Sequence, residues 1–189
     1  MYDKINKLNS KSMLIVILAD PINLNTGAIY TCNPNISCGC SSTSASITRI
    51  VGGESALAGS WGWAVSIFLQ GSFICGGSII SPSYILTAAH CAAPFTASQL
   101  TISAGSNMVS QGTQKRGVSN IIVHPSYSSD TLQNDIALLV LDSPLLMNDS
   151  SVRRICIPVV SSATLATSEW PPVNISVLFF LLCAIMYII

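Results

Sequence analysis

The segment that most restricts the fold of this chain is a short apolar strand that ends in a histidine and a cysteine. Residues Tyr84 to Ala88 form the apolar run, and His90 and Cys91 follow it. Upstream, residues 63–70 alternate apolar and polar side chains, a period of two that indicates a strand with one buried face. The chain is therefore predicted to build its core from short antiparallel strands.

Further strands are expected on both sides of this segment, separated by turn residues. With the run at 63–70, the expected strands are 73–80, 84–88, 100–105, 114–123 and 136–141. Ser, Pro and Ser at 81–83 interrupt the pattern, and the polar stretch 126–134 is expected to form a loop before Asp135. Six strands in this order predict an all-β domain.

Three motifs in the same region resemble those of the chymotrypsin/trypsin family of serine endopeptidases (peptidase S1). They are Arg49-Ile50-Val51-Gly52-Gly53, Leu86-Thr87-Ala88-Ala89-His90-Cys91 and Asp135-Ile136-Ala137-Leu138-Leu139. The resemblance covers roughly Ile50 to Pro158, about the first half of the family's domain. It implies a six-stranded antiparallel Greek-key barrel, the first barrel of the trypsin-like double-barrel fold, with the second barrel missing.

The resemblance also assigns roles to residues. His90 would be the general base and acid, Asp135 would orient its imidazole, and cleavage between Arg49 and Ile50 would activate a zymogen. No metal or cofactor is implied. Protein or peptide substrates and protease inhibitors are the implied partners of a completed enzyme.

Two disulfides follow from the same resemblance. Cys75 and Cys91 bracket the histidine and are expected to pair, and Cys156 is expected to tether a propeptide through Cys38 or Cys40. A zinc site within the Cys32–Cys40 cluster is not expected, because no histidine and no second cysteine pair at a suitable distance accompany it.

The nucleophile of the family does not occur in the sequence. The family places its serine in a Gly-Asp-Ser-Gly-Gly turn, and no glycine follows Gly117. An oxyanion turn needs backbone conformations that other residues adopt only at a cost. Ser78 lies in an expected barrel strand, and His124 is expected to be a surface loop histidine. We expect a truncated trypsin-like zymogen that is inactive as it stands. The alternative is a non-catalytic, membrane-attached pseudoprotease fragment that acts as a binding module.

The expected organisation of the chain has five parts. These are a signal peptide at 1–19, a Cys-containing propeptide at 20–49, a partial peptidase domain at 50–160, a spacer at 161–174 and an apolar tail at 175–189. A misplaced start codon is the alternative interpretation of the first part. The tail fits a glycolipid-anchor signal, a short tilted membrane anchor, or a translated intron or frameshifted exon.

The composition indicates the cellular compartment and argues against nucleic acid as a partner. The formal net charge is zero and only 8% of residues are charged, with no basic cluster, so nucleic-acid binding is not expected. Seven cysteines and the Asn-x-Ser sequons at Asn35, Asn148 and Asn174 indicate an oxidising secretory route. We expect a secreted protein, with membrane contact through 175–189.

Overall fold

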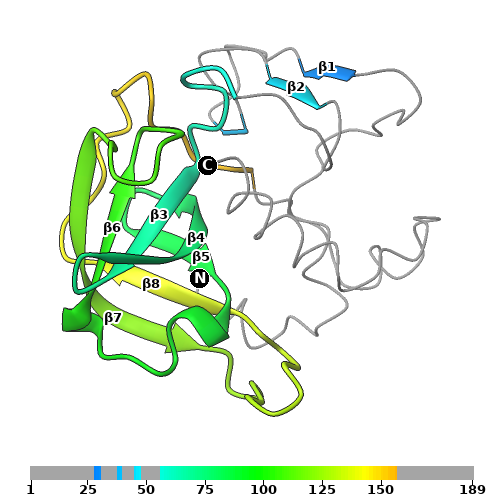
Figure 1. The fold of residues 1–189 in the computed structure, drawn as a ribbon, viewed down its shortest axis with the longest axis vertical. Coiled ribbons are helices and arrows are strands. Elements are labelled where there is room, and N and C mark those ends of the chain that lie inside the picture. The colour runs from blue at the N-terminus through cyan, green and yellow to red at the C-terminus, as the bar shows by residue number, and fades with distance from the viewer. Residues whose placement is uncertain (1–27, 31–37, 40–44, 48–55, 157–189) are drawn as a thin grey trace.

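The computed structural model describes residues 28–30, 38–39, 45–47 and 56–156 (Figure 1). Six strands form a closed barrel in the order β3-β4-β5-β8-β7-β6, and every neighbouring pair is antiparallel. The strands are β3 (Ala64–Leu69), β4 (Ser72–Ser81), β5 (Tyr84–Thr87), β6 (Leu100–Ala104), β7 (Gln114–Val123) and β8 (Ala137–Leu141). The all-β barrel predicted from the sequence is confirmed.

Four short elements complete the described part of the chain. β1 (Ala28–Tyr30) and β2 (Ala45–Ile47) pair as a separate two-stranded antiparallel sheet. Two single-turn 3₁₀ helices, η2 (Ala89–Cys91) and η3 (Ala97–Gln99), lie between β5 and β6. Arg49, Ile50, Cys40, Asn35, Asn174 and the tail 175–189 lie outside the described residues. Within the described part, no helix is long and apolar enough to cross a membrane.

The barrel core is filled by branched aliphatic side chains contributed by several strands. In β3 the side chains of Val65 and Ile67 are buried, whereas their neighbours Ala64 and Ser66 are only partly buried. This is the inward–outward alternation that the sequence pattern predicts. The largest fully buried side chains are Ile67, Ile79, Ile85, Leu100, Ile102 and Leu139, with Val152 and Thr87.

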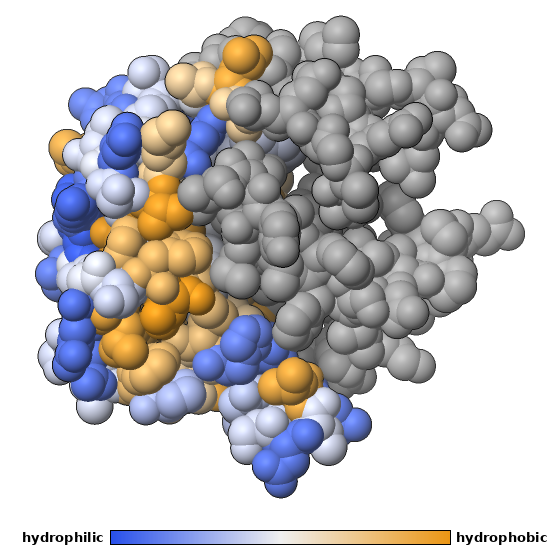
Figure 2. All heavy atoms as spheres, in the orientation of Figure 1, coloured by the Kyte–Doolittle hydropathy of each residue, from blue (hydrophilic) through white to orange (hydrophobic). Residues whose placement is uncertain are grey.

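Part of the barrel exterior is also apolar. Figure 2 shows hydrophobic residues gathered over the barrel where β3 lies in Figure 1. Phe68 and Phe73, which face each other across the β3–β4 hairpin, contribute an edge-to-face pair with ring centroids 6.1 Å apart. Both rings are only partly buried.

The pairing of β5 with β8 joins two distant parts of the chain. Thr87, the last residue of β5, lies opposite Ala137, the first residue of β8. Because the strands are antiparallel, the chain that leaves β5 and the chain that enters β8 meet at the same end of the barrel. The fold therefore brings His90 beside Asp135.

Two disulfides fix segments to the barrel. Cys75 in β4 is bonded to Cys91 in η2, so the histidine turn is attached to its neighbouring strand. Cys38, rather than Cys40, is bonded to Cys156. A backbone hydrogen bond of 2.8 Å from Gly39 N to Arg154 O lies beside this second bridge.

The carboxylate of Asp149 ties the segment after β8 to the start of β7. Its Oδ1 accepts hydrogen bonds from the backbone N and the Oγ of Ser151, at 2.9 and 2.6 Å, and its Oδ2 accepts from Thr113 Oγ1 at 2.8 Å. These bonds, led by those from Ser151, hold the pKa of Asp149 well below its usual range. The charged form thus stabilises the fold.

We predict that Asp149→Asn lowers the free energy of unfolding by about 1–2 kcal/mol at pH 7, because an amide replaces a charged acceptor. The depressed pKa gives a stabilisation that is present above roughly pH 4, the ordinary Asp range, and is lost as the pH falls toward the folded-state value. Urea denaturation at several pH values measures it. The difference in the free energy of unfolding between wild type and Asp149→Asn should become smaller at acidic pH.

Asp130→Asn is the matched control, because Asp130 is exposed and its carboxylate accepts only a 3.3 Å bond from the adjacent Ser129. It should leave the urea midpoint unchanged. If the free energies of unfolding of wild type and Asp149→Asn differ by the same amount at pH 3 and pH 7, the stabilisation does not come from the ionised form of Asp149. Both variants should be made in bacteria, since Asp149→Asn creates a new Asn-x-Ser sequon.

Candidate active site

His90 is presented by the turn that follows β5. Thr87 is buried, and its Oγ1 donates a 2.9 Å hydrogen bond to the carbonyl of Gly76 in β4. Ala88 and Ala89 are also buried, with 4% and 0% of their surface exposed. These small residues let the chain turn tightly against the barrel, and the His90 side chain is left 39% exposed.

Asp135 holds His90 through both of its carboxylate oxygens. Oδ1 accepts a 2.8 Å hydrogen bond from the backbone N of His90, and Oδ2 lies 2.6 Å from Nδ1 of the imidazole. The Asp135 side chain is 13% exposed, so it is the more buried partner. An unprotonated carboxylate can only accept, so Nδ1 carries the proton and the basic lone pair of the neutral ring is on Nε2. This arrangement suits a general base.

The loop before β8 aims Asp135 at the histidine. Asn134 has a φ of 54°, in the left-handed region that asparagine tolerates better than most residues. Its side-chain amide donates a 2.8 Å hydrogen bond to the carbonyl of Ser126, which closes the loop. The sequence predicted a loop here, but it did not indicate that Asn134 sets the geometry.

His124 has a structural position instead of the surface one expected from the sequence. It is 9% exposed, its Nδ1 accepts a 3.1 Å hydrogen bond from the backbone N of Ser126, and its own backbone N donates to Ile136 O. The prediction of a surface loop histidine is therefore wrong. The proline after His124 suggested an exposed turn, but β7 carries the residue into the junction with β8.

Tyr127 is a neighbour of the pair that sequence reasoning missed. Burial raises the pKa of its phenol, and the negative charge of Asp135 raises it further. The phenol is therefore a neutral group near the carboxylate at physiological pH. In the sequence, the only signal for Tyr127 is its position at the end of Val123-His124-Pro125-Ser126-Tyr127, close before Asp135.

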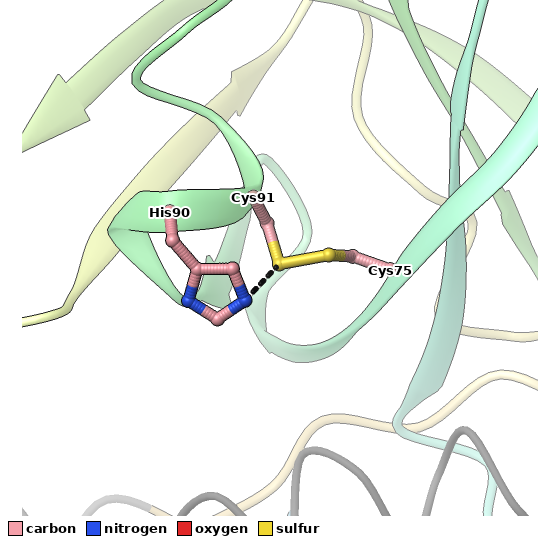
Figure 3. A group of neighbouring side chains, drawn as sticks. All are labelled: Cys75, His90 and Cys91. Carbon is pink, nitrogen blue, oxygen red and sulfur yellow. Dashed lines mark hydrogen bonds between the residues drawn. A yellow bond between two sulfur atoms is a disulfide. The ribbon is translucent and has the colours of Figure 1, made fainter. Parts of the chain in front are cut away.

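The disulfide forms one wall of the site. Nε2 of His90 lies 3.3 Å from Sγ of Cys91, and Figure 3 shows the imidazole edge directed at the bridge between Cys91 and Cys75. The possible ligand atoms of these three residues lie within 4.8 Å of one another. Both sulfurs are in the disulfide, so neither is a thiolate that could bind a metal ion in this state.

Two further residues considered in the sequence, the serine of a glycine-containing stretch and a glycosylation candidate, lie away from the His90–Asp135 pair. Ser78 is inside β4, paired with Ala64 and Leu86, and is 5% exposed, so it is a barrel residue as the sequence indicated. Asn148 is exposed in the segment after β8, where a glycosylating enzyme could reach it.

Comparison with known proteins identifies the family. The trypsin family model matches residues 50–171, and the chain belongs to the trypsin family (peptidase S1). The chain is 39% identical over 122 residues to the Bos taurus "Suppressor of tumorigenicity 14 protein homolog", with 59% of this chain and 14% of that protein covered. It is 39% identical over 125 residues to trypsin alpha of Drosophila melanogaster, with 65% and 48% covered.

Two further proteins are also similar to this chain. Trypsin alpha of Drosophila erecta is 38% identical over 125 residues, with 65% of this chain and 48% of that protein covered. Among solved structures, the scabies mite inactivated protease paralogue S-D1 is similar with a TM-score of 0.48 and 27% identity, covering 51% of this chain and 40% of that chain. This chain thus spans about half the length of the two Drosophila trypsins.

We predict that Asp135→Asn lowers the pKa of Tyr127, because removal of the negative charge makes the tyrosinate easier to form. The pKa should stay above the ordinary value of about 10, since burial is the larger cause and persists. Carbon-13 NMR of the tyrosine rings measures it, with Tyr127→Phe to assign the signal. Asp130→Asn, an exposed carboxylate of the same loop, is the control and should cause a smaller change. An unchanged or higher pKa in Asp135→Asn would contradict the assigned interaction.

Proposed function

We propose that this chain is a trypsin-like serine endopeptidase zymogen whose barrel supplies the general base His90 and its orienting acid Asp135. The observation that carries the proposal is the double contact of the Asp135 carboxylate with the backbone N and Nδ1 of His90. A serine hydroxyl is too weak an acid to attack an amide unaided. Nε2 of His90 would take its proton during attack and give it to the leaving amine, while Asp135 stabilises the imidazolium.

We also propose that the 189-residue chain alone does not hydrolyse peptides. The sequence contains no Gly-Asp-Ser-Gly-Gly motif, and the serine in the Cys75-Gly76-Gly77-Ser78 stretch is buried in β4. Without a nucleophile, His90 has no hydroxyl to deprotonate in this reaction. Family membership supports protein or peptide substrates, and protease inhibitors would be partners of the completed enzyme.

Activation would occur by cleavage between Arg49 and Ile50. The Cys38–Cys156 bridge spans this bond, because Cys38 precedes it and Cys156 follows it. The propeptide at 20–49 would therefore stay attached after cleavage. The two disulfides also support a secreted or extracellular protein. A signal peptide at 1–19, a spacer at 161–174 and membrane contact through 175–189 remain part of this proposal.

The first test is a reactive-serine probe. The purified 189-residue chain, cleaved after Arg49 and freed of the activating protease, is treated with a fluorophosphonate reporter. We expect no labelling, because the sequence contains no Gly-Asp-Ser-Gly-Gly motif to supply an activated serine and its oxyanion turn. Active trypsin treated in the same way is the positive control. Labelling of the purified chain above the background of His90→Ala would contradict the absence of a nucleophile.

The second test supplies the nucleophile. Residues 159–189 are replaced by a second half that contains the family's Gly-Asp-Ser-Gly-Gly motif, and the chimera is activated at Arg49. We expect cleavage of a peptide substrate, with kcat lowered about 10⁴-fold or more by His90→Ala and about 10⁴-fold by Asp135→Asn. Asp130→Asn should have no effect. A folded, cleaved chimera whose activity survives His90→Ala would contradict the proposed base.

A further inference from the structure

We propose that the Cys75–Cys91 disulfide is the oxidised form of a zinc site, and that its reduction lets Cys75, Cys91 and His90 bind one Zn²⁺. The inference is independent of the proposed function, because it requires neither a serine nor a substrate. It would add a redox-controlled metal site to the barrel.

The positions of the three ligand atoms support this site. A tetrahedral zinc ion with Zn–S of about 2.3 Å and Zn–N of about 2.0–2.1 Å places neighbouring ligand atoms roughly 3.5–3.8 Å apart. Nε2 of His90 is already 3.3 Å from Sγ of Cys91, and all three ligand atoms lie within 4.8 Å of one another. The two bonded sulfurs must separate to reach this spacing. Rotation of the two cysteine side chains would supply that movement.

Asp135 prepares the imidazole for a metal. Its Oδ2 lies 2.6 Å from Nδ1 of His90, so the proton is on Nδ1 and the lone pair of Nε2 is directed at the sulfurs. Metal-binding histidines commonly donate their second N–H to a carboxylate, which fixes the ring and increases its basicity. The barrel holds this outer partner in place before any ion arrives.

The surroundings suit zinc more than calcium or magnesium. Two sulfurs and one imidazole nitrogen are ligands that zinc prefers, whereas the alkaline-earth ions require oxygen. Cys75 and Cys91 are 8% and 6% exposed and belong to the apolar core, which would shield zinc–thiolate bonds from water. The His90 side chain is 39% exposed, and this exposed side gives an ion a route to the site. Three protein ligands would leave a fourth position for water.

The chemistry balances with a dithiol as the reductant. Two electrons and two protons pass from the dithiol to the Cys75–Cys91 bond, so the protein gains two thiols and the reductant becomes a disulfide. Zn²⁺ then binds both sulfurs as thiolates and two protons are released. A zinc ion on Nε2 occupies the lone pair of His90. The reduced, zinc-bound form would therefore lack a general base at this position.

Cobalt is the probe for the experiment. The full 189-residue chain is reduced anaerobically with dithiothreitol, freed of reductant, and titrated with Co²⁺. We expect thiolate-to-cobalt charge transfer and the visible bands of tetrahedral cobalt, both abolished by one equivalent of Zn²⁺. The oxidised chain should show neither band. Asp135→Asn should weaken zinc binding roughly 10–100-fold, as loss of an outer-shell partner does, and His90→Ala should weaken it more.

Matched cysteine variants locate the site. Cys75→Ser/Cys91→Ser should lose the cobalt bands, whereas Cys38→Ser/Cys156→Ser, which removes the other disulfide, should keep them. Equal cobalt binding by the reduced wild type and Cys75→Ser/Cys91→Ser would overturn the proposal, because the metal would then be on other cysteines. Bands unaffected by His90→Ala would overturn it as well.

Thermal unfolding gives a second readout that does not depend on spectra. Zinc should raise the Tm of the reduced chain and leave the Tm of the oxidised chain unchanged, because only the reduced fold offers the ligands. A reduced chain that is unfolded, and that stoichiometric zinc does not refold, would also overturn the proposal.

Discussion

The antiparallel pairing of β5 with β8 is the constraint on which the rest of the described structure depends. It closes the barrel between two segments that are far apart in sequence, and it sets Thr87 opposite Ala137. His90 and Asp135, the two residues of the proposed catalytic pair, lie just beyond these two positions. A one-residue shift in this register would turn the side chains of β8 to the other face and separate Asp135 from His90.

The Asp135–His90 contact in turn determines what the site can do. One carboxylate fixes the backbone and the ring of the histidine together, so the imidazole has one orientation and one tautomer. The Cys75–Cys91 bridge holds the same turn from the other side. A positioned base next to a disulfide supports the proposed protease chemistry in the oxidised state and the proposed zinc site in the reduced state.

Much of the fold could be predicted from sequence because its signals are local. The alternation in β3 and the turn residues before β5 depend only on neighbouring positions, and the expected strand at 114–123 coincides with β7. The pairing of strands across the barrel depends on long-range packing. Family resemblance was therefore needed to predict that His90 and Asp135 lie together.

Features that depend on tertiary contacts were not predicted. The burial of His124 and the raised pKa of Tyr127 arise where β7 meets β8, and the local sequence there resembles an exposed proline turn. The depressed pKa of Asp149 is due first to hydrogen bonds from the nearby Ser151, and the further bonds from Thr113 and Gln114 come from a different part of the chain. None of these contacts follows a periodic pattern of residues along the sequence, so the sequence pattern does not predict them.

The tautomers of the two histidines test the central claim most directly. Long-range nitrogen-15 NMR at a pH where both rings are neutral should show His90 with its proton on Nδ1, donated to Asp135. His124 should carry its proton on Nε2, because its Nδ1 accepts from Ser126. The chain thus contains its own internal control. If His90 were found as the Nε2–H tautomer, Asp135 would not be its orienting acid, and the account of the site would be wrong.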